Sequence, residues 1–147
     1  MWTKCIRAVP SWHGGHGRRD CVFIKNDSSP SSPRNLRDVG VARVYLFFSF
    51  TYHEVVYSCA LVHHLQFVGD KPDEDTGMWI VKRPRHSDAR AQVIQLSTIY
   101  RAAHLIPVYA GAAKISKKFS PANSLDKFRF YYVNKFADYD TFKFAHL

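Results

Sequence analysis

Histidine and cysteine side chains near the start of the chain are the first that could do chemistry, by binding a metal ion. His13 and His16 have the spacing His-x-x-His, and Cys5 and Cys21 lie on either side of them. Structural zinc sites usually draw on tight pairs such as Cys-x-x-Cys, and these two cysteines are not paired in this way. We therefore expect both histidines to be loop residues and no metal to be bound here.

A second candidate site is acidic, because Asp70, Asp73, Glu74 and Asp75 fall in one short segment. Carboxylate oxygens are the ligands of hard cations such as Ca²⁺, but the segment lacks the Asp-x-Asp-x-Asp-Gly spacing of a calcium loop. Nucleotidyl transfer by a carboxylate triad would need a sheet that alternates with helices, and the sequence pattern shows no such alternation. We expect a plain turn in this segment.

No nucleophile has a recognisable catalytic context either, since the chain contains no Gly-x-Ser-x-Gly elbow. The glycines at positions 14, 15 and 17 do not follow a strand and open a helix, as those of a phosphate-binding loop do. His63 and His64 are neighbours on a predicted strand, so they point to opposite faces and cannot bind one ion together. We predict that the protein is not an enzyme and binds neither a metal nor a cofactor.

Cationic side chains are the candidates that remain. The formal net charge of +9 favours an anionic partner such as nucleic acid. Exposed aromatic rings on a small barrel would also stack against the bases of a nucleic acid. A scattered, solvated rim of cations would give the same charge, so both interpretations stay open. The residues expected to contact phosphates lie in predicted loops and in the approach to a helix, and are Arg18, Arg19, Arg83, Arg85, Arg90, Lys114, Lys117 and Lys118.

The element that must position these side chains is a long predicted hairpin over residues 41–69. In each predicted strand, apolar and aromatic residues occupy every second position. A period of two over this length is typical of a strand with one buried face. The predicted turn lies near His53 and Glu54. The residues that share the apolar parity are Ala42, Val44, Leu46, Phe48, Phe50 and Tyr52 in the first strand, and Val55, Tyr57, Cys59, Leu61, Leu65 and Phe67 in the second.

Shorter strands are predicted on both sides of this hairpin, where apolar runs are bounded by turn-rich loops. Pro107 places the last of them at a sheet edge or a bulge, because proline cannot donate to a strand ladder. The predicted strands occupy residues 21–24, 78–81, 93–96 and 103–109, and residues 97–101 form a single helical turn.

A C-terminal helix is predicted over residues 125–136, with Ser124 as its N-cap and an apolar stripe at helical spacing. The fold class is therefore mostly β: a small, partly open β-barrel or a strongly bent antiparallel sheet with one C-terminal helix. The expected parts are an irregular segment at 1–19, a barrel-like domain at 20–111, and a basic connector with the helix at 112–147, packed on the same domain.

Composition bounds the class of protein. The 147 residues, of which 46% are hydrophobic, suffice for one domain with a real core. The three cysteines have irregular spacing and do not form a disulfide framework. No apolar run reaches the roughly 18–20 residues of a membrane-spanning helix, and the N-terminus lacks the apolar region of a secretory signal. We therefore expect an intracellular protein with no membrane partner.

Several segments are distinctive together: VARV and LFFSF within residues 41–50, CALVH at 59–63, residues 68–79, and IYRAAHLIPVY at 99–109. They resemble the C-terminal region of the large Plavaka-type DNA transposases of mushroom-forming fungi, as do residues 123–137, which end in YYVNKFA. The resemblance covers residues 18–137 and implies an accessory β-domain, in the nucleus, that lacks the catalytic core. The runs SSPSSP and KRPRHSDARAQ depart from the family pattern, which fits a truncated or decaying copy.

Two functions follow as expectations. The first is a non-catalytic accessory domain of a transposon-derived protein that binds DNA or chromatin weakly, without sequence specificity, through its basic loops. The alternative is a structural or assembly module that packs on another protein chain or on the missing catalytic region. A steep loss of DNA affinity with added salt would favour the first function.

Overall fold

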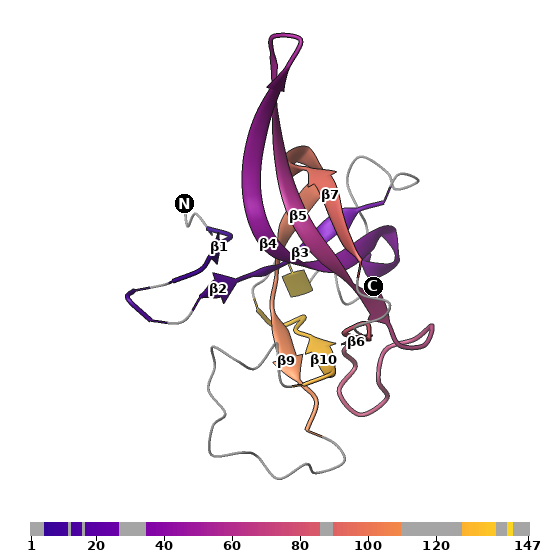
Figure 1. Ribbon diagram of the computed structural model, residues 1–147. Helices are drawn as coiled ribbons and strands as arrows, with labels where there is room; N and C mark the ends of the chain where they lie inside the picture. Colours follow the sequence, from indigo (N-terminus) through magenta and orange to yellow (C-terminus); the bar gives the residue numbers. More distant parts are fainter. Residues whose placement is uncertain are drawn as a thin grey trace.

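The computed structural model of the chain describes residues 5–11, 13–15, 17–26, 35–85, 90–109, 128–137 and 141–142. These residues are mostly β, and Figure 1 shows a bent sheet from which one long hairpin projects. The elements are β1 (Ala8–Val9), β2 (Arg18–Arg19), β3 (Cys21–Lys25), η1 (Leu36–Asp38), β4 (Val39–Tyr52), β5 (Val55–Phe67), β6 (Ile80–Lys82), β7 (Ala91–Gln95), η2 (Leu96–Thr98), β8 (Ile99–Ala103), β9 (Leu105–Pro107) and β10 (Phe130–Val133).

The main sheet has the strand order β8-β3-β4-β5-β6-β10-β9, and β7 pairs with β5 beside that path. All of its pairs are antiparallel. The short 3₁₀ helix η2 joins β7 to β8, which returns to pair with β3, so the sheet nearly closes on itself. The predicted mostly β, barrel-like fold is therefore confirmed. Pro107 lies in β9, at the end of the strand order, as its missing N–H group requires.

Two hydrophobic clusters lie on opposite faces of β3, β4 and β5. The first lies inside the barrel formed with β7 and β8 and contains Val22, Ile24, Ala42, Val44, Ala60 and Val62. The second lies under β6 and β10 and contains Phe23, Leu36, Val39, Val41, Trp79, Val81, Tyr131 and Val133. Neighbouring residues such as Val22 and Phe23 belong to different clusters, because successive side chains of a strand point to opposite faces. The hairpin was predicted to bury one face, whereas its base buries both.

A β-bulge in β4 corrects the predicted parity of the hairpin. Val44 is opposite Val62, but Leu46 is opposite Leu61, so Tyr45 is an extra residue in the ladder. Because Leu61 and Val62 are consecutive, Val44 and Leu46 must face opposite sides of the sheet. Ala42 and Val44 therefore point into the barrel, while the even-numbered residues from Leu46 to Tyr52 point away from it.

The predicted C-terminal helix is wrong. Phe130–Val133 is strand β10, which pairs with β6 on one side and β9 on the other. Tyr131 and Val133 are buried and Phe130 is exposed, which is the alternation of a strand. Two open strand edges supply hydrogen-bond partners that outweigh a helical pattern set by only a few aromatic residues. Ser124 lies outside the described residues, and the division at residues 19 and 111 stays a prediction.

Candidate functional site

The predicted phosphate-binding cations do not form one patch among the described residues. Arg18 and Arg19 make up β2, whereas Arg83 and Arg85 follow β6, and Figure 1 shows these two strands on different sides of the molecule. Arg90 is exposed and immediately precedes β7. Their binding to DNA stays a prediction. The remaining predicted residues lie outside the described part of the chain, and are Lys114, Lys117 and Lys118.

Arg19 belongs to a compact group of side chains at the foot of the long hairpin, which we call the cationic base: Arg19, Arg43, Tyr45 and His63. The guanidinium carbons of Arg19 and Arg43 each lie 5.5 Å from the centroid of the Tyr45 ring. The ring centroids of Tyr45 and His63 are 4.4 Å apart. A tyrosine ring attracts cations to its face, so the bulged residue draws two positive charges together.

Burial and the charge of Arg43 set the protonation of His63 and of the neighbouring Cys21. Burial lowers the pKa of His63, and the positive charge of Arg43 lowers it further, so this imidazole is neutral at pH 7. Cys21 is directly opposite Arg43 in the ladder, and burial raises its pKa to about 12 despite the nearby guanidinium. A thiol with this pKa stays protonated and does not act as a nucleophile.

Above the cationic base, residues 46–58 of β4, the turn and β5 project as a two-stranded arm (Figure 1). Register pairs Phe50 with Tyr57 and Tyr52 with Val55, so these side chains share one face of the arm. The rings of Phe50 and Tyr57 are stacked, with centroids 5.2 Å apart and planes at 21°. We call this the apolar face, and its residues are Leu46, Phe48, Phe50, Tyr52, Val55 and Tyr57.

The apolar face is exposed in spite of its composition. Phe50 is 48% exposed, Tyr52 61% and Val55 50%, whereas the buried valines at the foot of the same strands have no exposed area. His63 is on the same face as Tyr57, because alternate residues of β5 point to the same side. The cationic base and the apolar face are therefore successive parts of one surface.

The arm also differs from the rest of the chain in charge. The arm and the foot residues next to it, 44–62, contain no lysine and no arginine, and Glu54 is their one carboxylate, in a chain with a net charge of +9. Interface cores between proteins are poor in charge and rich in aromatic residues, whereas nucleic-acid surfaces need cations against the phosphates. The apolar face therefore has the chemistry of a protein interface.

Both edges of the arm lie open within the described part of the chain. β3 pairs with β4 only as far as Arg43, and β7 pairs with β5 only as far as Cys59. The N–H of Val44 still donates to the Asp20 carbonyl at 2.9 Å, and nearer the tip the described ladder pairs β4 and β5 only with each other. Natural proteins usually protect such edges with lysine, proline or a covering element, and an unprotected apolar ribbon marks a site of association.

The turn at the tip holds two residues in the left-handed region, His53 at φ 47° and Glu54 at φ 64°. The turn is where the sequence predicts it, and a two-residue turn with both φ values positive usually contains Asn-Gly. For a residue with a β-carbon this conformation is unfavourable by about 1 kcal/mol or more. The tip thus keeps an imidazole and a carboxylate at the expense of stability.

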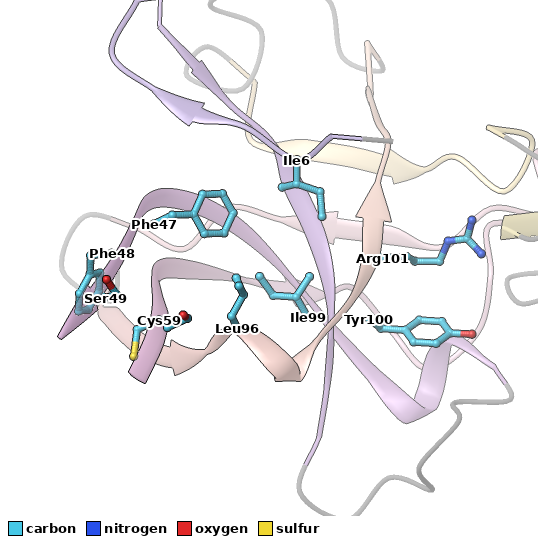
Figure 2. A pocket seen from close by; sticks show the side chains of 10 residues that line it. Ile6, Phe47, Phe48, Ser49, Cys59, Leu96, Ile99, Tyr100 and Arg101 are labelled. Carbon is cyan, nitrogen blue, oxygen red and sulfur yellow. The ribbon is translucent and has the colours of Figure 1, made fainter. Parts of the chain in front are cut away.

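An open cavity of about 610 Å³ lies at the mouth of the barrel, beside the arm. Figure 2 shows Ile6, Phe47, Leu96 and Ile99 pointing toward one another there, while the guanidinium of Arg101 points away from them. The polar side chains at its rim do not converge on a common point, as those of a catalytic pocket do. The cavity has the character of an uncovered end of the barrel core.

The acidic segment forms a turn, as expected. The Asp73 carboxylate accepts hydrogen bonds from the backbone N–H and the hydroxyl of Thr76, at 3.0 and 2.8 Å, and Lys71 pairs with Glu74 at 2.6 Å. Across the described ranges, no three His, Cys, Asp or Glu side chains are grouped so that they could hold a metal ion. None of the helices described is long and apolar enough to cross a membrane.

Sequence reasoning missed both parts of this surface. The signal for the apolar face was present, because strands of 14 and 13 residues are longer than a small barrel can cover. The cationic base left no such signal, since it depends on the bulge that turns Tyr45 toward Arg19. No protein-family model, no curated protein and no solved structure matches this chain, so the surface itself is the basis for inferring a function.

Proposed function

We propose that the chain is a non-catalytic assembly module of a transposon-derived protein, which docks on another protein chain through the apolar face of its arm. One observation carries this proposal: an uncharged face of exposed aromatic and aliphatic side chains on strands that extend beyond the core. Leaving such a face in water forgoes roughly 25 cal/mol for each Å² of apolar area that a partner would cover.

The resemblance to transposase C-terminal regions supports the same proposal. The resembling segments at residues 41–50 and 59–63 lie in β4 and β5, and thus in the arm and its foot. An accessory domain separated from a catalytic core needs a surface through which it meets the rest of the assembly. The apolar face has the composition that such a surface requires.

Site-specific photo-crosslinking in cells of the source organism tests the proposal. A photoreactive phenylalanine analogue at Phe50 is compared with the same analogue at Phe136, which is 63% exposed but lies beyond β10. We expect one discrete, identifiable protein adduct from position 50, abolished when Tyr57 is changed to serine, and none from position 136. Equal labelling from both positions, or no adduct from position 50, would contradict the proposal.

A second candidate function, sequence-independent DNA binding, is favoured by the cationic base and by Arg18 beside it. The side chain of Arg18 is 42% exposed and pairs with Asp20 at 2.8 Å. Fluorescence anisotropy with a DNA duplex tests this candidate, with Arg18→Ala/Arg19→Ala compared to Arg83→Ala/Arg85→Ala. Binding at the cationic base predicts that only the first pair flattens the plot of log affinity against log salt, by about 0.9 for each phosphate that the variant no longer neutralises. If the protein does not bind the duplex at low salt, DNA binding is ruled out and the assembly function remains.

A further inference from the structure

We propose that the partner of the apolar face is a second copy of this chain, with the two arms packed face to face and running in opposite directions. This inference rests on the proposed assembly function and names its partner. It is drawn from the order of charges along the arm, from the position of the stacked ring pair, and from the turn at the tip.

Charge is arranged along the arm so that the surface complements itself. The carboxylate of Glu54 is at the tip, the guanidinium of Arg19 is at the cationic base, and the apolar face lies between them. A two-fold axis across the arm brings the tip of each copy to the base of the other. Glu54 of one copy then meets Arg19 of the other, and the reverse contact forms at the opposite end, as an isologous interface requires.

The ring pair falls where a two-fold axis would pass. The tip at His53 is about 27 Å from Tyr45 along the hairpin, at roughly 3.4 Å for each residue, and the midpoint is at Ser49. The next residue, Phe50, is paired with Tyr57. The axis therefore places the four rings of two copies at the centre of the interface, where aromatic side chains contribute most to binding.

The conformation of the tip argues that its side chains are used. Asn-Gly would form this turn without strain, yet the chain has His53 and Glu54 at φ 47° and 64°. Backbone strain of this kind clusters at positions with a function. A carboxylate that reaches a guanidinium on the other copy gives the strained tip such a function.

The interface expected from the arm alone is small. Two strands are about 10 Å wide, so each copy contributes a flat area of about 300 Å², which falls in the class of transient contacts. Each copy also has a net charge of +9, which opposes association. We therefore expect a dimer with a dissociation constant on the order of 10 to 100 μM at moderate salt.

Charge reversal of the full chain, followed by analytical ultracentrifugation over a range of concentrations, tests this arrangement. In Glu54→Arg homodimers arginine would meet arginine, and in Arg19→Glu homodimers glutamate would meet glutamate. We expect each variant alone to dimerise at least about tenfold more weakly than the wild type. An equimolar mixture of the two restores both contacts in a heterodimer, and the double variant restores them in a homodimer.

The mixture distinguishes an interface effect from a folding defect, since a misfolded variant would not recover on mixing. Glu54→Arg is a matched check, because it changes an exposed turn and leaves the contact between Arg19 and Tyr45 intact. A wild type that stays monomeric at several hundred micromolar, or a dimer that the mixture does not restore, would overturn the inference. A chain that fails these tests but still gives a discrete Phe50 adduct with a different protein would keep the proposed assembly function.

Discussion

At its foot the long hairpin is covered on both sides, and Val41, Val44 and Val62 have no exposed area. A few residues further along the same strands, Phe50 and Tyr52 are about half exposed or more. The two regions are built from the same kinds of residue, and in both β4 pairs with β5, with the bulge at Tyr45 between them. They differ in what lies above and below: two hydrophobic clusters at the foot, and no described element over the apolar face of the arm.

This difference separates two uses of an apolar β-strand. At the foot, burial supplies the free energy that holds the sheet together. In the arm, the same composition contributes little to the stability of the isolated chain, because its transfer from water is incomplete. The comparison therefore predicts that substitutions at the foot change the stability of the fold, whereas those in the arm change association.

The largest expected effect comes from truncating the same type of side chain in each region. Phe23→Ala removes a fully buried ring from the second cluster and is expected to cost about 3–5 kcal/mol of unfolding free energy. Phe50→Ala, the matched control, removes a half-exposed ring and is expected to cost no more than about 1 kcal/mol. Urea unfolding followed by tryptophan fluorescence measures both. Equal losses would show that the arm is part of the folding core.

The sequence predicts the regions of this fold that depend on long local patterns. Residues 39–67 alternate over many positions and turn at His53 and Glu54, so the hairpin and its turn are correctly predicted. The run at residues 91–95 followed by a 3₁₀ turn is also close to its predicted place. Period and turn chemistry act locally and are visible in a single chain.

What the sequence does not predict depends on one extra residue or on distant partners. The bulge at Tyr45 reverses the parity of everything beyond it, and no residue type at that position announces an insertion. Phe130–Val133 became a strand because β6 and β9 offer edges from far along the chain. The candidate site depends on both kinds of information, since the bulge creates the cationic base and turns the apolar face outward.

A second prediction sharpens the contrast between stability and association at the tip. His53→Asn with Glu54→Gly suits the left-handed turn and is expected to raise the unfolding free energy by about 1 kcal/mol, while weakening the proposed dimer. His13→Asn is the control, because His13 also has a positive φ, of 51°, but lies in the loop between β1 and β2. Thermal unfolding and sedimentation measure the two effects. If the tip variant is more stable and still dimerises as the wild type does, the tip is not part of the interface.

The smallest expected effect concerns His63, where the foot and the arm meet. Burial and Arg43 lower its pKa in the folded state, so the unfolded chain binds a proton at this residue more tightly. The stability that comes from the neutral imidazole is present above its unfolded pKa of about 6.5 and is lost as the pH falls through the lower folded pKa. We expect the unfolding free energy of the wild type to fall more steeply between about pH 7 and 5 than that of His63→Gln.

Other groups titrate over the same range, so the difference between the two proteins isolates His63. His64→Gln is the matched control, because His64 points to the opposite face and lies 2.6 Å from the side-chain oxygen of Gln92. A change of slope shared by His63→Gln and His64→Gln would be a general effect of removing an imidazole from β5. Superimposable slopes for the wild type and His63→Gln would mean that the imidazole is as well solvated in the folded chain as in the unfolded one. His63 would then lie outside the buried foot of the hairpin, and the cationic base would belong to the exposed arm.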